Sequence, residues 1–208
     1  VLDGLLTVGR NPKYLNDLEF DRSKIHPSKD IDEVVSNAKI IIMAAPSAYL
    51  KDFLAPLTVP LEDKFIVSAI KGIIPGDYKT AAEYLHDKYN LTYRQIGIIS
   101  GPSHAEEVGR RKLSYLTVVC TDEDNARLIG SKIETPYIRL SYSSDIYGVE
   151  YAAIMKNIYA ISVGIAAGLG YGDNFRAVLI ASCAKEMTRF LQESYPDNRD
   201  TLNPAYLG

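Results

Sequence analysis

Short apolar runs alternate with mixed apolar and polar stretches through the first two thirds of the chain. The apolar runs predict strands at residues 40–44, 65–70, 96–100 and 115–120, with a fifth at 137–141. The intervening stretches predict helices at residues 31–37, around 49–54, at 77–89 and at 104–109. This alternation is typical of βαβ units, and the continuous hydrophobicity of the first two strands predicts that both of their faces are covered. The expected fold class is therefore α/β, with a Rossmann-like, mostly parallel sheet.

The pattern changes after residue 144. Residues 145–169 predict one long helix that is apolar nearly all round, and residues 173–193 predict a second helix with Asp173 as its N-cap. The glycine-rich segment 168–172 predicts the turn between them. We therefore expect two domains, an α/β domain over residues 1–144 and the start of an all-helical domain over residues 145–208.

The apolar stretch from Val149 to Leu169 is long enough to span a bilayer, but Lys156 and Asn157 lie near its middle. A central lysine costs an inserting helix roughly 3 kcal/mol. We interpret the stretch as a buried helix of a soluble protein and expect no integral membrane association. Both ends of the chain look cut, and we expect that a segment covering the two helices is missing.

Composition narrows the function classes. The 208 residues are 47% hydrophobic and 24% charged, and 23 basic against 26 acidic residues give a net charge of -3. This balance argues against a dedicated nucleic-acid binder. Only two cysteines occur, Cys120 and Cys183, without histidines at metal-ligand spacing, so neither a disulfide scaffold nor a metal site is expected. Together with the lack of a signal peptide at residues 1–10, this favours the cytoplasm.

Ligands of open parallel sheets bind outside the carboxyl ends of the strands. Ser47, Lys71 and Ser103 each follow a predicted strand, so we expect them along one edge. Lys71, with Gly72 letting the backbone bend away, could place an ammonium group over a carbonyl or phosphate, or it could be an ordinary solvated lysine. The turn from Gly101 to Ser103 is either an anion or hydroxyl site or a plain strand-to-helix turn.

Lys156 lies among apolar neighbours on its predicted helix. Burial would lower its pKa, and such a lysine can act as the proton donor or acceptor that accompanies hydride transfer. The alternative is an inter-domain salt bridge to Asp145, Glu150 or Asp173.

The other candidate residues give weaker indications of function. His104 is expected to hydrogen-bond at a helix N-terminus, His26 and His86 to lie on the surface, and Cys183 to be a buried, inert thiol. The chain contains no G-x-G-x-x-G, so the pyrophosphate loop of a dinucleotide site is not among these residues.

Several motifs in order resemble the NAD(P)-dependent glycerol-3-phosphate dehydrogenases. They are Ala45-Pro46-Ser47, Ile70-Lys71-Gly72, Ser100-Gly101-Pro102-Ser103-His104-Ala105, Gly148-Val149-Glu150, Lys156-Asn157 and Gly172-Asp173-Asn174. The resemblance runs from about residue 11 to residue 208. It implies an enzyme with a Rossmann-like and a helical domain that interconverts dihydroxyacetone phosphate and sn-glycerol 3-phosphate with NAD or NADP, as in glycerophospholipid precursor supply.

The resemblance also assigns roles. It implies that Lys156 transfers the proton and that Lys71 contacts the substrate and the nicotinamide side of the cofactor. Gly101, Ser103 and Asn157 match substrate-binding positions. Pro46, Ser47 and Ala105 match cofactor-contacting positions. The family's glycine-rich loop and first strand, and an Arg-Asn pair that follows the last residues, are not in this chain.

Two rival functions remain open from the sequence. One is a reductase of the same architecture that acts on another hydroxy acid or phosphosugar. The other is a non-catalytic module that binds glycerol phosphate. Partners are expected to be a small phosphorylated substrate and a second copy in a homodimer, and no nucleic acid.

Overall fold

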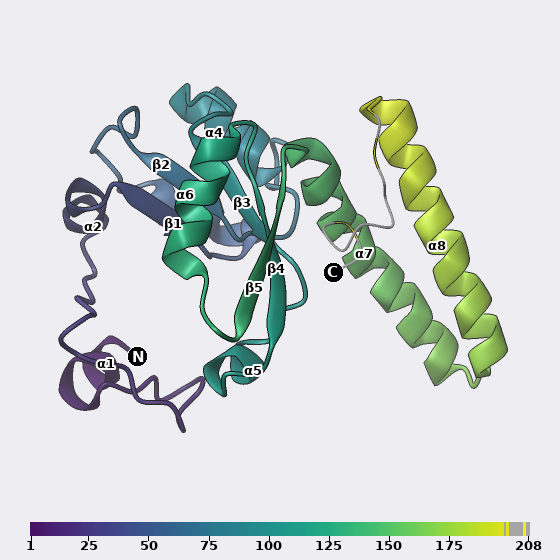
Figure 1. Cartoon of the computed structure of the whole chain (residues 1–208), viewed down its shortest axis with the longest axis horizontal. Coiled ribbons are helices and arrows are strands. Elements are labelled where there is room, and N and C mark those ends of the chain that lie inside the picture. Colours follow the sequence, from purple (N-terminus) through teal and green to yellow (C-terminus); the bar gives the residue numbers. More distant parts are fainter. Residues whose placement is uncertain (198, 200–205, 207–208) are drawn as a thin grey trace.

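The computed structural model describes residues 1–197, 199 and 206. Five strands and eight α-helices follow one another along these residues (Figure 1). The strands are β1 (Ile40–Met43), β2 (Phe65–Ser68), β3 (Ile96–Ser100), β4 (Ser114–Val119) and β5 (Ile138–Ser143). The helices are α1 (Leu2–Val8), α2 (Ile31–Asn37), α3 (Leu50–Leu54), α4 (Ala81–Tyr89), α5 (Ala105–Gly109), α6 (Glu123–Ile133), α7 (Ile146–Gly168) and α8 (Asp173–Ser194), and a 3-10 turn spans Ser47–Tyr49.

The sheet has the strand order β1-β2-β3-β4-β5. The pairs β1–β2, β2–β3 and β4–β5 are parallel, and only β3–β4 is antiparallel. This confirms the predicted mostly parallel, Rossmann-like sheet, with ends that shift by a few residues. Because β1, β2 and β3 run in one direction, the residues that follow them come out at one edge of the sheet.

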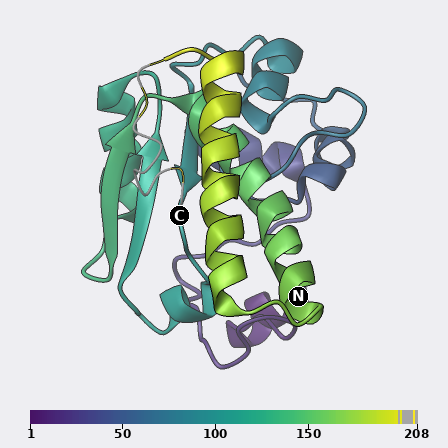
Figure 2. The same cartoon turned by 90° about the vertical axis from the view of Figure 1, so that its right-hand side faces the viewer.

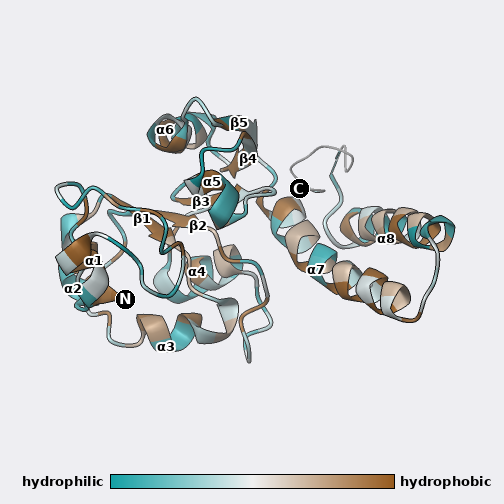
Figure 3. Ribbon diagram, turned by 90° about the horizontal axis from the view of Figure 1, so that it is seen from below, coloured by the Kyte–Doolittle hydropathy of each residue, from teal (hydrophilic) through white to brown (hydrophobic). Residues whose placement is uncertain are grey.

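Helices cover both faces of the sheet, and alternate residues of each strand point to opposite faces. Ile66 and Ile98 belong to the buried cluster that also contains residues of α3, α4 and α7. Val67 faces the other way, into a second cluster with Ala126 and Ile129 of α6. Figure 3, seen from below, shows α6 on one side of the sheet and α3 and α4 on the other.

The expectation that the first two strands are covered on both faces holds only for the second. Val67 of β2 is fully buried, but Ile42 of β1 is 51% exposed. The reason is that the cluster under α6 reaches Val67 but does not extend to Ile42, which lies on the edge strand of the described sheet.

Helices α7 and α8 form an antiparallel pair beside the sheet, with α7 the nearer of the two (Figures 1 and 2). The first half of α7 is buried through Val149, Ala152 and Ala153. Its second half exposes Ile158, Ile161 and Ile165, so the predicted buried helix is buried over only part of its length. Among the residues described, no helix is long and apolar enough to cross a membrane.

The residues that cap the helices explain several local differences from the predictions. Thr80 caps α4 in a reciprocal capping box with Glu83, so this helix begins at Ala81 and not at residue 77. Gly172, not Asp173, precedes α8, and Asp173 instead pairs with Arg176. Helices α1 and α6 lie outside the predicted set. Asp122 is the signal for α6, because its side chain accepts a hydrogen bond from the Asn125 backbone N–H.

A buried ion pair fixes the point where the sheet ends and α7 begins. The Asp145 carboxylate accepts a hydrogen bond of 3.0 Å from the Gly148 backbone N–H and one of 2.9 Å from the Tyr206 hydroxyl. It also forms an ion pair with Arg199, whose side chain is 6% exposed. Burial by itself raises the pKa of Asp145, but the hydrogen bonds from Arg199, Gly148 and Tyr206 outweigh it and hold the pKa below its ordinary value.

Asp145→Asn is therefore expected to destabilise the protein by about 3–5 kcal/mol at neutral pH, because it removes the negative charge that pairs with the buried Arg199 guanidinium. A pKa that is lowered on folding gives stability that is lost as pH falls, so the difference between variant and wild type should shrink below about pH 4. Urea denaturation of both proteins across pH measures this. Arg189→Gln, which breaks the exposed pair with Glu193, is the control and should leave unfolding unchanged. Equal stability of Asp145→Asn and wild type at pH 7 would contradict the assignment.

Candidate functional site

The carboxyl ends of β1 and β2 meet through Ser47 and Gly72. A side chain at position 72 would have its Cβ 3.1 Å from the Cβ of Ser47 and well inside van der Waals contact with the Ser47 hydroxyl oxygen. The two strand-end turns are therefore packed directly on each other. Gly72 also has a φ of +144°, a conformation that residues with a Cβ rarely adopt. The glycine after Lys71 is thus required both by backbone conformation and by space.

Gly101 follows β3 and has a φ of +128°. A Cβ at this position would lie 2.7 Å from the Tyr115 carbonyl oxygen, because β4 passes close by in the antiparallel pairing. The packing alone therefore accounts for glycine at position 101, beside any role in binding.

Lys156 lies on α7, whose buried half packs on the same face of the sheet as Ile98 of β3. Its side chain is half-buried. Burial lowers the pKa of Lys156, and the nearby positive charge of Lys71 lowers it further. Two lysines that are 85 positions apart in the sequence therefore lie close enough for one ammonium group to affect the other.

The alternative that Lys156 forms an inter-domain salt bridge is wrong for all three proposed partners. Asp145 pairs with Arg199, and Asp173 pairs with Arg176. Glu150 accepts hydrogen bonds from the Ala82 backbone N–H. Within the described part of the chain, neither Lys156 nor Lys71 has a carboxylate within ion-pair distance.

Two neighbouring positive charges without a counter-ion repel each other, and an anion placed between them would relieve that repulsion. Lys71 is exposed, so a ligand can reach this pair from the solvent. The arrangement is suited to a small anionic molecule. The lowered pKa of Lys156 also brings this amine nearer to the range where it can exchange a proton.

The remaining candidates lie on the surface. Ser103, Ala105 and Asn157 are exposed, and the side chains of Ser103 and Asn157 form no hydrogen bond or ion pair with another described residue. Asn157 follows Lys156 on a helix, so its side chain leaves α7 in a different direction. Pro46 precedes the 3-10 turn that carries Ser47. The structure brings Ser47, Lys71 and Lys156 toward one another, and places Ser103, Ala105 and Asn157 at accessible positions.

The expectation for His104 is wrong in its detail. His104 stands at the N-cap of α5, but its side chain makes no capping hydrogen bond. Its backbone carbonyl oxygen instead accepts the first hydrogen bonds of the helix, from Glu107 and Val108. Cys183, by contrast, is buried as expected, and burial raises the pKa of its thiol.

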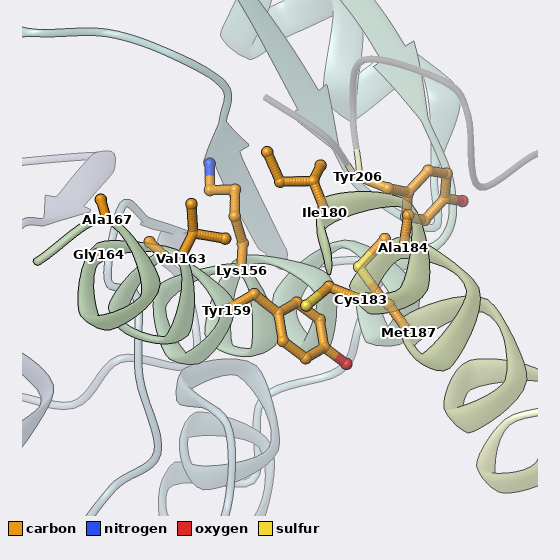
Figure 4. A pocket seen from close by; sticks show the side chains of 11 residues that line it. Lys156, Tyr159, Val163, Gly164, Ala167, Ile180, Cys183, Ala184, Met187 and Tyr206 are labelled. Atoms are coloured by element: carbon orange, nitrogen blue, oxygen red, sulfur yellow. The ribbon is translucent and has the colours of Figure 1, made fainter. Parts of the chain in front are cut away.

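A groove of about 490 Å³ runs between α7 and α8 next to Lys156. Its lining is mostly apolar, from Tyr159, Ala160, Val163, Gly164, Ala167, Ile180, Cys183, Ala184, Met187 and Tyr206. Figure 4 shows Lys156 and Val163 extending from the same side of α7. Because phosphate needs charged or hydrogen-bonding partners, the apolar part of this groove is not suited to it, and Lys156 is the charged residue in its lining.

Sequence reasoning missed the contact between α7 and the first turn of α4. Glu150 is 5% exposed, and each of its carboxylate oxygens lies 3.3 Å from the Ala82 backbone nitrogen. Beside it, the Tyr151 and Tyr195 hydroxyls both donate to Glu83, each at 3.3 Å. The sequence signal was present as a glutamate at the start of an apolar helix, since buried carboxylates need partners.

These features place the chain among Rossmann-like α/β proteins that continue into a helical region. Residues 2–126 match the family described as NAD-dependent glycerol-3-phosphate dehydrogenase N-terminus, and residues 145–208 match the corresponding C-terminus. The chain belongs to the NAD-dependent glycerol-3-phosphate dehydrogenase family.

Curated relatives agree with this membership. A glycerol-3-phosphate dehydrogenase (NAD(P)+) of Ectopseudomonas mendocina is 34% identical over 182 residues, which cover 88% of this chain and 53% of the relative. One from Thermobifida fusca is 30% identical over 209 residues, which cover 100% of this chain and 62% of the relative. The chain thus spans between half and two thirds of the length of these relatives.

Solved structures share the fold. The Plasmodium falciparum glycerol-3-phosphate dehydrogenase superposes with a TM-score of 0.90 at 22% identity, over 99% of this chain and 58% of that one. The Coxiella burnetii enzyme gives a TM-score of 0.87 at 24% identity, over 100% of this chain and 63% of that one. At this identity the likeness establishes the fold.

The contact between Ser47 and Gly72 predicts the effect of adding a single methyl group. Gly72→Ala should destabilise the protein by roughly 1–3 kcal/mol, because it combines a strained φ with a clash against Ser47. Gly164→Ala is the matched control, since it lies within α7 and nothing lies within 4 Å of its new Cβ. It should stabilise the protein by roughly 0.5–1 kcal/mol. Thermal or denaturant unfolding compares the two, and a neutral Gly72→Ala would show that the two turns are not packed as described.

Proposed function

We propose that the protein interconverts dihydroxyacetone phosphate and sn-glycerol 3-phosphate by hydride transfer with NADH or NADPH. The observation that carries this proposal is the juxtaposition of Lys71 and Lys156, two lysines with no carboxylate partner among the described residues, at the carboxyl edge of a parallel sheet. Family membership supplies the substrate class and the cofactor class. The names of the curated relatives agree with both.

The residues at the strand ends fit one part of a dinucleotide. The turns after β1 and β2 approach each other without intervening side chains, because position 72 is a glycine. A groove of about 700 Å³ beside β1 reaches Ala44 and Ala45, immediately before Pro46 and Ser47. We assign Pro46, Ser47, Lys71 and Ala105 to the cofactor, with Lys71 on its nicotinamide side. The bound cofactor would supply or accept a hydride at C2 of the substrate.

The chain's own residues perform the proton half of the reaction. In the direction of reduction, Lys156 donates a proton from Nζ to the oxygen at C2, and in the reverse direction it takes the hydroxyl proton. Lys71 stabilises the negative charge that develops on that oxygen and contributes to holding the substrate. Gly101, Ser103 and Asn157 complete the substrate contacts in this proposal.

The domain division belongs to the same proposal. Residues 1–144 form the nucleotide-binding part and residues 145–208 belong to the helical, substrate-binding part. The change from sheet to helices between Ser143 and Ile146, and the buried ion pair located there, support this boundary. We further propose a cytoplasmic enzyme, which agrees with two cysteines that are both free thiols.

Lys156→Ala should lower kcat by about 10²–10⁴-fold without unfolding the protein, because it removes the proton donor. The assay is oxidation of NADH and of NADPH with dihydroxyacetone phosphate, made with the protein extended by the family's glycine-rich loop and Arg-Asn pair. Comparing the two cofactors also gives the cofactor preference. Lys185→Ala, an exposed lysine on α8, is the matched control and should keep wild-type turnover.

The other possible outcomes of this assay test the role of Lys156 and the two rival functions. Near-normal turnover of Lys156→Ala would remove the assignment of Lys156. Binding of glycerol 3-phosphate without oxidation of either cofactor, by a folded wild type that carries the family's glycine-rich loop and Arg-Asn pair, would favour the non-catalytic module. Turnover of another hydroxy acid or phosphosugar in preference to dihydroxyacetone phosphate would favour a related reductase.

We also propose that the protein forms a homodimer through the apolar surface of α7 and α8. Several large apolar side chains there are exposed, namely Ile158, Ile161, Ile165, Val178 and Ile180. Figure 3 shows brown, hydrophobic bands on both helices, interleaved with white and teal ones. Exposed apolar patches of this kind mark interaction surfaces.

Sedimentation equilibrium tests this surface. The wild type is expected at twice the monomer mass at micromolar concentration, and Ile161→Glu is expected as a monomer, because a buried charge in an apolar interface is costly. Leu113→Glu places a charge at an equally exposed leucine outside the two helices and should remain dimeric. A monomeric wild type, or a dimer that Ile161→Glu leaves intact, would contradict the proposal.

A further inference from the structure

Glu150 is a buried carboxylate to which the proposed reaction assigns no role. It lies on α7, six residues before Lys156, which corresponds to about 9 Å along a helix axis. It is 5% exposed, and both of its oxygens face the Ala82 backbone N–H at 3.3 Å. Within the described residues it forms no ion pair, so its partners are the backbone and the Thr80 side chain in the first turn of α4.

Helix α4, which Glu150 contacts, is also the next helix after Lys71 in the chain. Residues 71–80 connect β2 to α4, and this connection is closed by the Ile74 backbone N–H, which donates to the Lys79 carbonyl oxygen at 2.8 Å. Ile74 is fully buried, and Asp77 pairs with Lys51 of α3. Lys71 is therefore joined to the start of α4 by a connection that is fixed at several points.

We propose that Glu150 is a positioning residue, which holds α7 against the first turn of α4 and thereby sets the position of Lys156 relative to Lys71. The effect on catalysis rests on the proposed function, but the positioning of Lys156 by the contact between α7 and α4 does not. Three groups at the start of α4 contribute to holding α7 there. Thr80 and the Ala82 N–H interact with Glu150, and Glu83 accepts hydrogen bonds from the Tyr151 and Tyr195 hydroxyls.

The charge state of Glu150 supports a role other than simple stability. Burial raises its pKa to about 7, and the neighbouring Glu83 carboxylate acts in the same direction, against the hydrogen bonds from Thr80 and Ala82. A carboxyl group raised in this way gives stability below its ordinary pKa that is lost as pH rises toward 7. An apolar residue would avoid that loss, but it would offer no acceptor to the Ala82 N–H.

The test uses three variants. Glu150→Ala removes the acceptor, and Glu150→Gln keeps a carbonyl acceptor without the charge. Val149→Ala truncates the adjacent, fully buried residue and so weakens the same packing without removing the acceptor. If Glu150→Ala does not fold, Glu150→Met takes its place, because it fills a similar volume and accepts no hydrogen bond.

The first readout needs no turnover. Lysines are labelled by reductive ¹³C-methylation, and the NMR signal of Lys156 is assigned by its loss in Lys156→Arg. The pKa of Lys156 should rise toward its ordinary value in Glu150→Ala, because Lys156 moves away from Lys71 and into water. It should stay at the wild-type value in Glu150→Gln and in Val149→Ala.

The second readout is the proposed reaction. Glu150→Ala should lower kcat by at least about tenfold and leave KM for the cofactor within about twofold, since Lys156 is misplaced and the strand-end turns are not. Glu150→Gln should restore most of kcat. If no turnover is found in any form but the pKa of Lys156 still responds as stated, the proposed function fails and the positioning role stands.

Two results would overturn the inference. One is a folded Glu150→Ala, or Glu150→Met in its place, with the wild-type pKa of Lys156. The other is a Val149→Ala that shifts this pKa as far as Glu150→Ala does, because the effect would then be one of general stability.

Discussion

The packing of the first half of α7 against the sheet and against α4 decides where Lys156 lies. Val149 and Ala152 belong to the same buried cluster as Ile98 of β3, and Glu150 beside them meets the backbone of α4. Because a helix is rigid over such a distance, fixing its first two turns also fixes the residues that follow them. Lys156 is thereby held at the sheet edge where Lys71 emerges.

The electrostatics of the site follow from this placement. The buried charge of Asp145 at the junction is compensated by Arg199, the Gly148 N–H and Tyr206. Lys71 and Lys156 lack such partners in the described part of the chain, and the pKa of Lys156 is lowered by burial and by the charge of Lys71. Two neighbouring lysines without counter-ions among the described residues form a surface suited to an anionic ligand.

The glycines that support the site are explained by close approaches of the backbone. Gly72 lies under Ser47, and Gly101 lies against the Tyr115 carbonyl oxygen, both with positive φ. These constraints come from how neighbouring strands and turns pack, so a glycine in such a motif is needed even before any ligand is considered. The family motifs therefore combine residues that shape the edge, such as Gly72, with residues that can act on a ligand, such as Lys71.

The sequence by itself determined the α/β class, the polar turns that follow the parallel strands at one edge of the sheet, and the long apolar helix that carries Lys156. It could do so because hydrophobic periodicity and position at a strand end are local properties of the chain. It could not determine that β1 is an edge strand of the described sheet or that Asp145 pairs with Arg199. Nor could it determine that Glu150 contacts α4, so that Lys156 has no salt bridge with a described residue. Those outcomes depend on which distant residues meet. Three carboxylates were equally available to Lys156 in the sequence, and only tertiary packing, by giving each of them another partner, decided among the alternatives.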